Sequence, residues 1–171
     1  MSTEWPFNLA AIQEAIAEVI PDEECIVFRD RRLTWREVTD RTRRLANVLA
    51  GAGLGARAQG RAGLAGHESH EDHLAIYLYN GNEYLEGMLA AFKLRAVPVN
   101  VNYRYVEDEL RYLFTDADLK AVVHEPEFAS TLDLIRAEVP RQIHIPPEHS
   151  ATGAMHQEKR RARTLSLNFY Q

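Results

Sequence analysis

Three histidines recur at every third position in the segment His67-Glu68-Ser69-His70-Glu71-Asp72-His73, with carboxylates between them. Imidazole nitrogens and carboxylate oxygens bind Zn²⁺, so the segment would offer metal ligands if it were helical. The spacing differs from H-E-x-x-H, which places two ligands and a base on one helix face. A solvated loop therefore explains the segment better, and its carboxylates would favour the protonated imidazoles. We expect no metal site here.

A second candidate is Gly51-Ala52-Gly53-Leu54-Gly55-Ala56, which has the spelling G-x-G-x-x-A of a pyrophosphate-binding turn. That turn must follow a strand and open a helix. Here the glycines follow a helical pattern and no helical pattern begins at Ala56, so we predict that they end a helix. The motifs G-x-x-x-x-G-K-[ST] and G-x-S-x-G are missing from the sequence, which removes two further classes of enzyme.

The apolar pattern along the chain predicts alternating helices and strands. Leu9, Ile12, Ile16, Val19 and Ile20 predict an amphipathic helix over residues ~7 to 20 that ends at Pro21. Thr34, with Glu37 three residues later, forms a capping box that begins the next helix. That helix is predicted to end at Gly51 or Gly53. Its apolar side comprises Trp35, Val38, Leu45, Val48 and Leu49.

Further along the chain, residues 51–72 are rich in glycine, alanine and charge and are expected to form a loop. The remaining predicted strands are 25–28, 73–79, 97–101 and 119–124, and the helices that alternate with the last three are 84–92, 107–115 and 128–138. This alternation predicts an α/β fold, a parallel sheet with helices on both faces.

The character of the sequence changes near residue 140. Residues 1–140 contain 15 Lys and Arg against 23 Asp and Glu, whereas residues 141–171 contain 5 against 2. The second segment includes the basic run Lys159-Arg160-Arg161-Ala162-Arg163 and has little periodicity. We therefore predict one domain over 1–140 and an irregular tail over 141–171 that is disordered or has no native structure.

Two segments resemble the adenylate-forming, AMP-binding superfamily, specifically acyl-CoA synthetases: Leu33-Thr34-Trp35-Arg36-Glu37-Val38 and Phe92-Lys93-Leu94-Arg95-Ala96-Val97-Pro98-Val99-Asn100. The segments Ala65-Gly66-His67-Glu68-Ser69 and Asn100-Val101-Asn102-Tyr103-Arg104-Tyr105 are more similar to actinobacterial fatty-acid or steroid-acid CoA ligases than to peptide-synthetase modules. The resemblance implies an incomplete N-terminal subdomain, about the first quarter of the enzyme.

By this resemblance, a complete enzyme would make an acyl-adenylate from ATP and a carboxylic acid, and then transfer the acyl group to CoA, with Mg²⁺ on the phosphates. The family's phosphate loop is rich in Ser, Thr and Gly and ends in Pro-Lys-Gly; the nearest approach here is Ser150-Ala151-Thr152-Gly153-Ala154 with Lys159. We therefore expect no catalytic and no cofactor-binding residue in this chain, and no activity from it alone. The alternative is a non-catalytic remnant or a binding module.

Asn102, Tyr103 and Arg104 are the candidate site residues. They follow a predicted strand at its carboxyl end, the edge at which open parallel sheets bind ligands. They would border a substrate or nucleotide cleft in a complete enzyme. The alternative is a capped turn that leads into the next helix.

Composition narrows the class of protein further. The 171 residues are 46% hydrophobic and 26% charged, which is typical of a globular domain. With one cysteine, Cys25, no internal disulfide is possible, and with no signal-peptide pattern or long apolar run we expect a cytoplasmic protein. The net charge of −5 argues against nucleic acid as a partner. An incomplete sheet would leave one edge uncovered, so self-association is expected.

Overall fold

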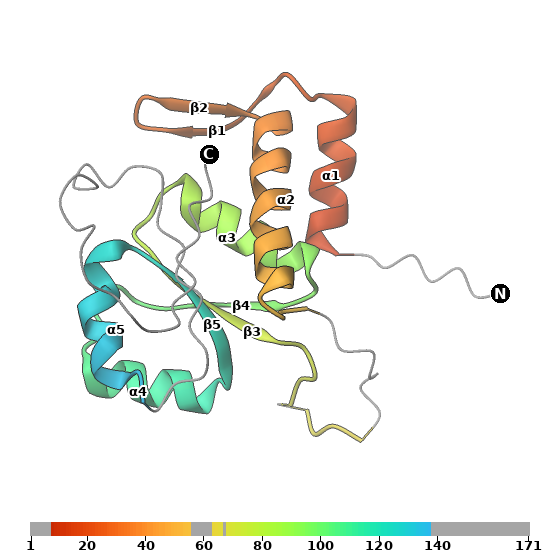
Figure 1. Cartoon of the computed structure of the whole chain (residues 1–171). Coiled ribbons are helices and arrows are strands. Elements are labelled where there is room, and N and C mark those ends of the chain that lie inside the picture. Colours follow the sequence, from red (N-terminus) through yellow and green to blue (C-terminus); the bar gives the residue numbers. More distant parts are fainter. Residues whose placement is uncertain (1–7, 56–62, 67, 138–171) are drawn as a thin grey trace.

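The computed structural model describes residues 8–55, 63–66 and 68–137 (Figure 1). The helices are α1 (Leu9–Val19), α2 (Trp35–Gly51), α3 (Asn82–Lys93), α4 (Glu107–Asp116), the short 3-10 helix η1 (Pro126–Phe128) and α5 (Ala129–Ile135). The strands are β1 (Glu24–Phe28), β2 (Arg31–Thr34), β3 (His73–Tyr77), β4 (Val97–Asn100) and β5 (Leu119–His124). The predicted α/β class is confirmed.

The central sheet has three parallel strands in the order β4-β3-β5. In the middle strand, Ala75 lies opposite Val99 of β4 and Val122 of β5. The chain leaves β4, forms α4 and returns as β5 on the far side of β3. Because the three strands run in one direction, their carboxyl ends lie at the same edge of the sheet.

Helices cover both faces of this sheet, as predicted (Figure 1). Leu74 and Ile76 of β3 enter one core with buried side chains of α2 and α3, whereas Ala75 and Tyr77 enter the other with those of α4 and α5. The alternation follows from the period of two along a strand. Each face of β3 is therefore removed from water by different helices.

The start of α2 has the predicted geometry. The Thr34 side chain accepts a hydrogen bond from the Glu37 backbone N–H at 3.2 Å, and the Glu37 carboxylate accepts one from the Thr34 backbone N–H at 2.7 Å. Both bonds satisfy N–H groups that have no partner within the helix. The helix ends at Gly51, and Gly53 has a φ of 97°, so the glycine run terminates a helix as predicted.

Strands β1 and β2 form an antiparallel hairpin beside α2 (Figure 1). Ile26 and Leu33 pack against Val38 of α2, and the partly buried Phe28 and Leu89 join this third core. The sequence predicted only one strand here, over 25–28. The return is a full partner strand, and it carries Arg31 toward α3.

Helix α1 has the predicted length, but its apolar side is largely exposed. Leu9 and Val19 are 57% and 80% exposed, whereas Gln13 is buried and donates a hydrogen bond to the Thr39 hydroxyl at 2.6 Å. Lys93 of α3 hydrogen-bonds Gln13 and forms an ion pair with the neighbouring Glu14. Polar contacts thus join α1 to the protein, and large apolar side chains that predicted the helix, such as Leu9 and Val19, lie outside the core.

Two other expectations need correction or fall outside the described residues. The helix predicted over 128–138 is a short 3-10 turn followed by α5, which ends at Ile135. The predicted tail, 141–171, lies outside the described residues, so the boundary at 140 stays a prediction. Within 8–55, 63–66 and 68–137, the structure contains no helix long and apolar enough to span a membrane.

Candidate functional site

Three aromatic rings meet just beyond the carboxyl ends of the parallel strands. Tyr79 follows β3, Tyr103 follows β4 and Phe128 follows β5. The ring centroid of Tyr79 lies 5.0 Å from that of Tyr103 and 5.1 Å from that of Phe128, both at tilted angles. Phe128 also stacks on Tyr77 at 4.3 Å. Tilted and offset pairs at these separations are favourable arrangements of aromatic rings. We call Tyr79, Tyr103 and Phe128 the edge cluster.

The backbone past the strand ends holds this cluster in place. The Glu125 backbone N–H donates to the Tyr77 carbonyl at 3.2 Å, and the Val101 N–H donates to the Ile76 carbonyl at 3.0 Å. The ladder of the sheet therefore continues one residue beyond β4 and β5. It fixes the points from which Tyr103 and Phe128 project.

The predicted site residues Asn102, Tyr103 and Arg104 form a capped turn. The Asn102 side-chain oxygen accepts a hydrogen bond from the Arg104 N–H at 3.0 Å, and the Asn102 carbonyl accepts one from the Tyr105 N–H at 3.0 Å. Tyr103 is 40% exposed, and the Arg104 guanidinium lies 5.4 Å from the centre of its ring. The turn explains the conformation, and the role of these residues as a cleft border stays a prediction.

Two carboxylates on the segment after β5, Glu125 and Glu127, lie close to Tyr79. Glu127 accepts a hydrogen bond from the Tyr79 hydroxyl, which raises the pKa of Tyr79 to about 12. Glu125 accepts a hydrogen bond from the Tyr79 backbone N–H. These bonds connect the loop after β3 with the segment after β5, across the carboxyl edge of the sheet.

Glu125 is the most perturbed acid in this part of the molecule. Partial burial raises the pKa of its carboxyl to about 7, and repulsion from the Glu83 and Glu127 carboxylates adds to the rise. The hydrogen bond from Tyr79 opposes it. Burial and like charges both disfavour the ionised form, so Glu125 exchanges its proton close to neutral pH.

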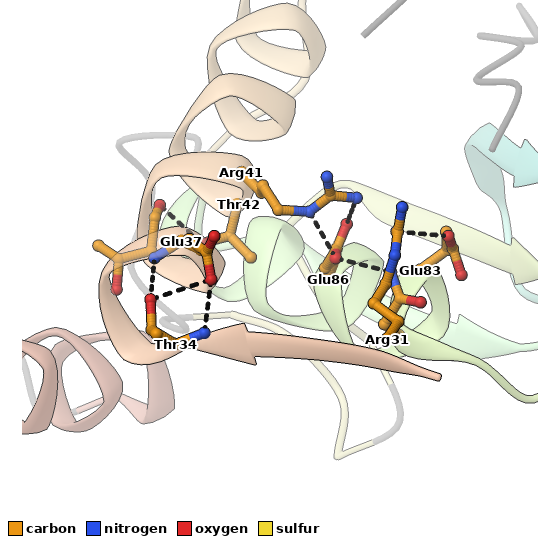
Figure 2. Close-up of polar contacts among 9 residues, drawn as sticks. Arg31, Thr34, Glu37, Arg41, Thr42, Glu83 and Glu86 are labelled. Atoms are coloured by element: carbon orange, nitrogen blue, oxygen red, sulfur yellow. Dashed lines mark hydrogen bonds and ion pairs between the residues drawn. The ribbon is translucent and has the colours of Figure 1, made fainter. Parts of the chain in front are cut away.

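Figure 2 shows polar contacts that join α3 to α2 and to the hairpin. Arg41 of α2 donates two hydrogen bonds to the Glu86 carboxylate, at 2.8 and 2.9 Å, and Asn82 donates a third at 3.0 Å. Arg31 of the hairpin reaches Glu83 at 3.5 Å. Since α3 begins directly after the loop that carries Tyr79, these contacts fix the position of that loop.

The described part of the histidine segment begins at Glu68. Among the described residues, no three His, Cys, Asp or Glu side chains converge as metal ligands would. His73 belongs to β3, where its ring Nδ1 lies 2.5 Å from the Ala117 carbonyl oxygen. His67 lies outside the described residues, as do Ser150 to Ala154 and Lys159.

The edge presents aromatic faces, the Arg104 guanidinium and carboxylates. Sequence reasoning found only the residues after β4. It missed Tyr79, Glu125 and Glu127, although these follow β3 and β5 just as Asn102 follows β4. The rule that parallel strands end at one edge would have found them if it had been applied to every strand.

Comparison with known proteins connects this geometry to a family. Residues 13–166 match the family described as AMP-binding enzyme. This chain belongs to that family. Over 139 residues it is 45% identical to the medium-chain acyl-CoA ligase Mig of Mycobacterium avium, a match that covers 81% of this chain and 25% of Mig. Over 122 residues it is 33% identical to the 3-oxocholest-4-en-26-oate–CoA ligase of Rhodococcus rhodochrous, covering 71% of this chain and 20% of that ligase.

Solved structures agree on the fold. A fatty acyl CoA synthetase of Mycobacterium tuberculosis matches with a TM-score of 0.66 at 25% identity, over 80% of this chain and 26% of that one. The anthranilate CoA ligase AuaEII, solved with anthranoyl-AMP, matches with a TM-score of 0.69 at 19% identity, over 82% of this chain and 25% of that one. The chain therefore spans about a quarter of the length of the relatives it matches.

Proposed function

We propose that this chain is the N-terminal part of an ATP-dependent CoA ligase for a fatty or steroid acid. The observation that carries the proposal is the 45% identity to a medium-chain acyl-CoA ligase over 139 residues, within a chain that belongs to the AMP-binding enzyme family. In complete form such a ligase would join the acid to AMP and then to CoA. The structure supports the proposal by offering a sheet edge with exposed aromatic groups beside Arg104.

Adenylation brings two anions together, the carboxylate of the acid and the α-phosphate of ATP. It requires backbone N–H donors, a cation for the phosphates and carboxylates for Mg²⁺. Among the described residues, no three His, Cys, Asp or Glu side chains converge as ligands of a metal ion would. We therefore propose that ATP and Mg²⁺ are bound by parts of a complete ligase outside this chain, and that the 171-residue chain alone has no ligase activity.

A chimera tests the first proposal. The matching segment of Mig would be replaced by residues 8–137 of this chain, and CoA-ester formation from medium-chain acids would be measured. We expect activity within about tenfold of Mig, because a 45% identical segment keeps most core contacts. A folded chimera with no activity would favour the alternative, a non-catalytic remnant or binding module.

The isolated chain tests the second proposal. We expect no carboxylate-dependent exchange of pyrophosphate into ATP, since each missing electrostatic group commonly contributes several kcal/mol to the transition state. Exchange by the rigorously purified chain that is abolished by Arg104→Ala would contradict this and place the Asn102 to Arg104 turn in a working site.

We also propose self-association through the sheet. In the described part of the chain, β4 and β5 each pair with β3 alone, so their outer edges present backbone groups that a second strand can bind. Sedimentation velocity across a concentration series would detect it. A monomer at all concentrations would contradict the proposal.

A further inference from the structure

We propose that the apolar side of α1 is an interface for a second copy of this chain, with the two α1 helices antiparallel. The four residues that define this side recur at intervals of three, four and three: Leu9, Ile12, Ile16 and Val19. Helices that pair along an apolar strip have this spacing. We call the four residues the α1 seam. The interface is separate from the sheet edges and does not depend on the proposed ligase function.

The side of α1 that packs on the protein is filled by small and polar groups. Ala10 and Ala17 are buried there, and Gln13 donates its hydrogen bond to Thr39. The large apolar side chains of the seam are left outside, and three of them are exposed: Leu9, Ile12 and Val19. A surface helix ordinarily turns such side chains to the core. Because this arrangement is reversed in α1, pairing of the seam would remove apolar surface from water.

The seam is complementary to itself. Its intervals read the same in both directions, so a two-fold axis across the middle of α1 brings each seam residue opposite another one. Leu9 then lies opposite Val19 of the second copy, and Ile12 lies opposite Ile16. Every layer of the pair is apolar, and each side chain contacts one from the other copy.

The charges of α1 decide the orientation and the kind of partner. The helix contains two charged residues: Glu14, which pairs with Lys93 and Arg43, and Glu18, which is exposed. In an antiparallel pair, Glu18 comes level with the first turn of the other α1, where backbone N–H groups carry partial positive charge. In a parallel pair, the two Glu18 carboxylates would lie at the same level and repel each other. Helices that lie on membranes carry Lys or Arg on their polar side. Since α1 has neither, the seam suits another α1 better than a lipid surface.

Sedimentation velocity of the full 171-residue chain, from about 10 μM to about 1 mM, measures the pairing. We expect a weak dimer, because two short helices bury less than the roughly 1,200 Å² of an ordinary stable interface. Leu9→Glu should raise the dissociation constant at least about tenfold, since it places a charge in an apolar layer. Leu134→Glu on α5 is the matched control: it is the same change at a leucine of similar exposure, 62% against 57%, and should leave the constant unchanged.

A monomer at all concentrations would overturn the proposal, and so would equal effects of the two variants. A dimer that Leu9→Glu leaves unchanged would also overturn it, and would leave the sheet edges as the route of self-association. Protection of Leu9→Cys from a thiol reagent in a monomer would show that another part of the same chain covers the seam, which contradicts pairing of two copies. None of these results bears on the proposed ligase function.

Cysteine cross-linking tests the orientation. In a Cys25→Ser background, a mixture of Leu9→Cys and Val19→Cys chains should form a mixed disulfide on mild oxidation, because a disulfide requires Cα atoms within about 7 Å. Either variant alone should cross-link several-fold less, since its two thiols lie about 15 Å apart along an antiparallel pair. Mass spectrometry distinguishes the products. Disulfides that form as readily within one variant as in the mixture would indicate parallel or random contact and would overturn the proposal.

Discussion

The ion pair between Arg41 and Glu86 joins α2 to α3 in the interior of the protein. The two side chains are 8% and 2% exposed, and two hydrogen bonds join them at 2.8 and 2.9 Å. Arg41→Met keeps most of the apolar stem but removes both guanidinium hydrogen bonds to the buried Glu86 carboxylate, while the hydrogen bond from Asn82 stays. Breaking a buried pair by removing one partner costs roughly 3 to 5 kcal/mol. Because Asn82 remains, we expect about 3 kcal/mol.

Urea denaturation followed by circular dichroism would measure this loss. Arg43→Met is a matched control: Arg43 lies half a turn away on α2 and pairs with Glu14, but its side chain is 52% exposed. An exposed pair contributes up to about 1 kcal/mol, so the control should lose no more than that. We expect the double variant Arg41→Met with Glu86→Leu to be more stable than Arg41→Met alone, since it leaves no buried charge.

Equal losses in Arg41→Met and Arg43→Met would refute this reasoning. It would mean that water reaches Glu86 when Arg41 is removed, and that α3 is held mainly by its apolar contacts with α2. The reasoning would also be refuted if the double variant were less stable than Arg41→Met. The attraction between Arg41 and Glu86 would then exceed the free energy that removing both charges from water costs.

Four further predictions concern stability, pH and metal binding. Thr34→Ala should lower the free energy of unfolding by about 1 kcal/mol through loss of the cap on α2, as measured by denaturation. Gly87→Val should cost about 1 to 3 kcal/mol, because a Cβ at Gly87 would already lie 3.1 Å from Ile76; unchanged stability would show that Ile76 can move. The raised pKa of Glu125, about 7 in the fold against 4.5 ordinarily, makes the folded state bind the proton more tightly. The free energy of unfolding should therefore fall from pH 4.5 to 7, by less than the roughly 3 kcal/mol of an unscreened shift because Glu125 is partly exposed, and Glu125→Gln should be more stable than the unaltered chain at pH 8. Zn²⁺ titration should give no tight one-to-one binding, and tight binding lost in His70→Ala would contradict the loop interpretation.

The sequence by itself determined the order of the elements and the local starts and stops. The capping box at Thr34 and Glu37 involves residues three apart, so it forms wherever the helix forms. Gly53 ends α2 because its φ of 97° suits glycine. Buried strands such as β3 were visible as apolar runs, and their alternation with helices determined a parallel sheet with two covered faces. These features depend on neighbours in the chain.

Only the tertiary structure decided which polar groups meet. Arg41 and Glu86 are 45 residues apart, and each alone has the pattern of an exposed residue on an amphipathic helix. Tyr79 and Glu127 are also far apart in the sequence. So are Gln13 and Thr39, whose hydrogen bond lies on the side of α1 that faces the protein and leaves the apolar side facing outward. Periodicity gives the faces of an element but not its partner, because hydrogen bonds between distant segments depend on the packing angle of the elements that carry them. At the carboxyl edge, the strand-end rule could have gathered Tyr79, Glu125 and Glu127 from the sequence, but only the fold shows which side chains meet there, as the rings of Tyr79 and Phe128 do.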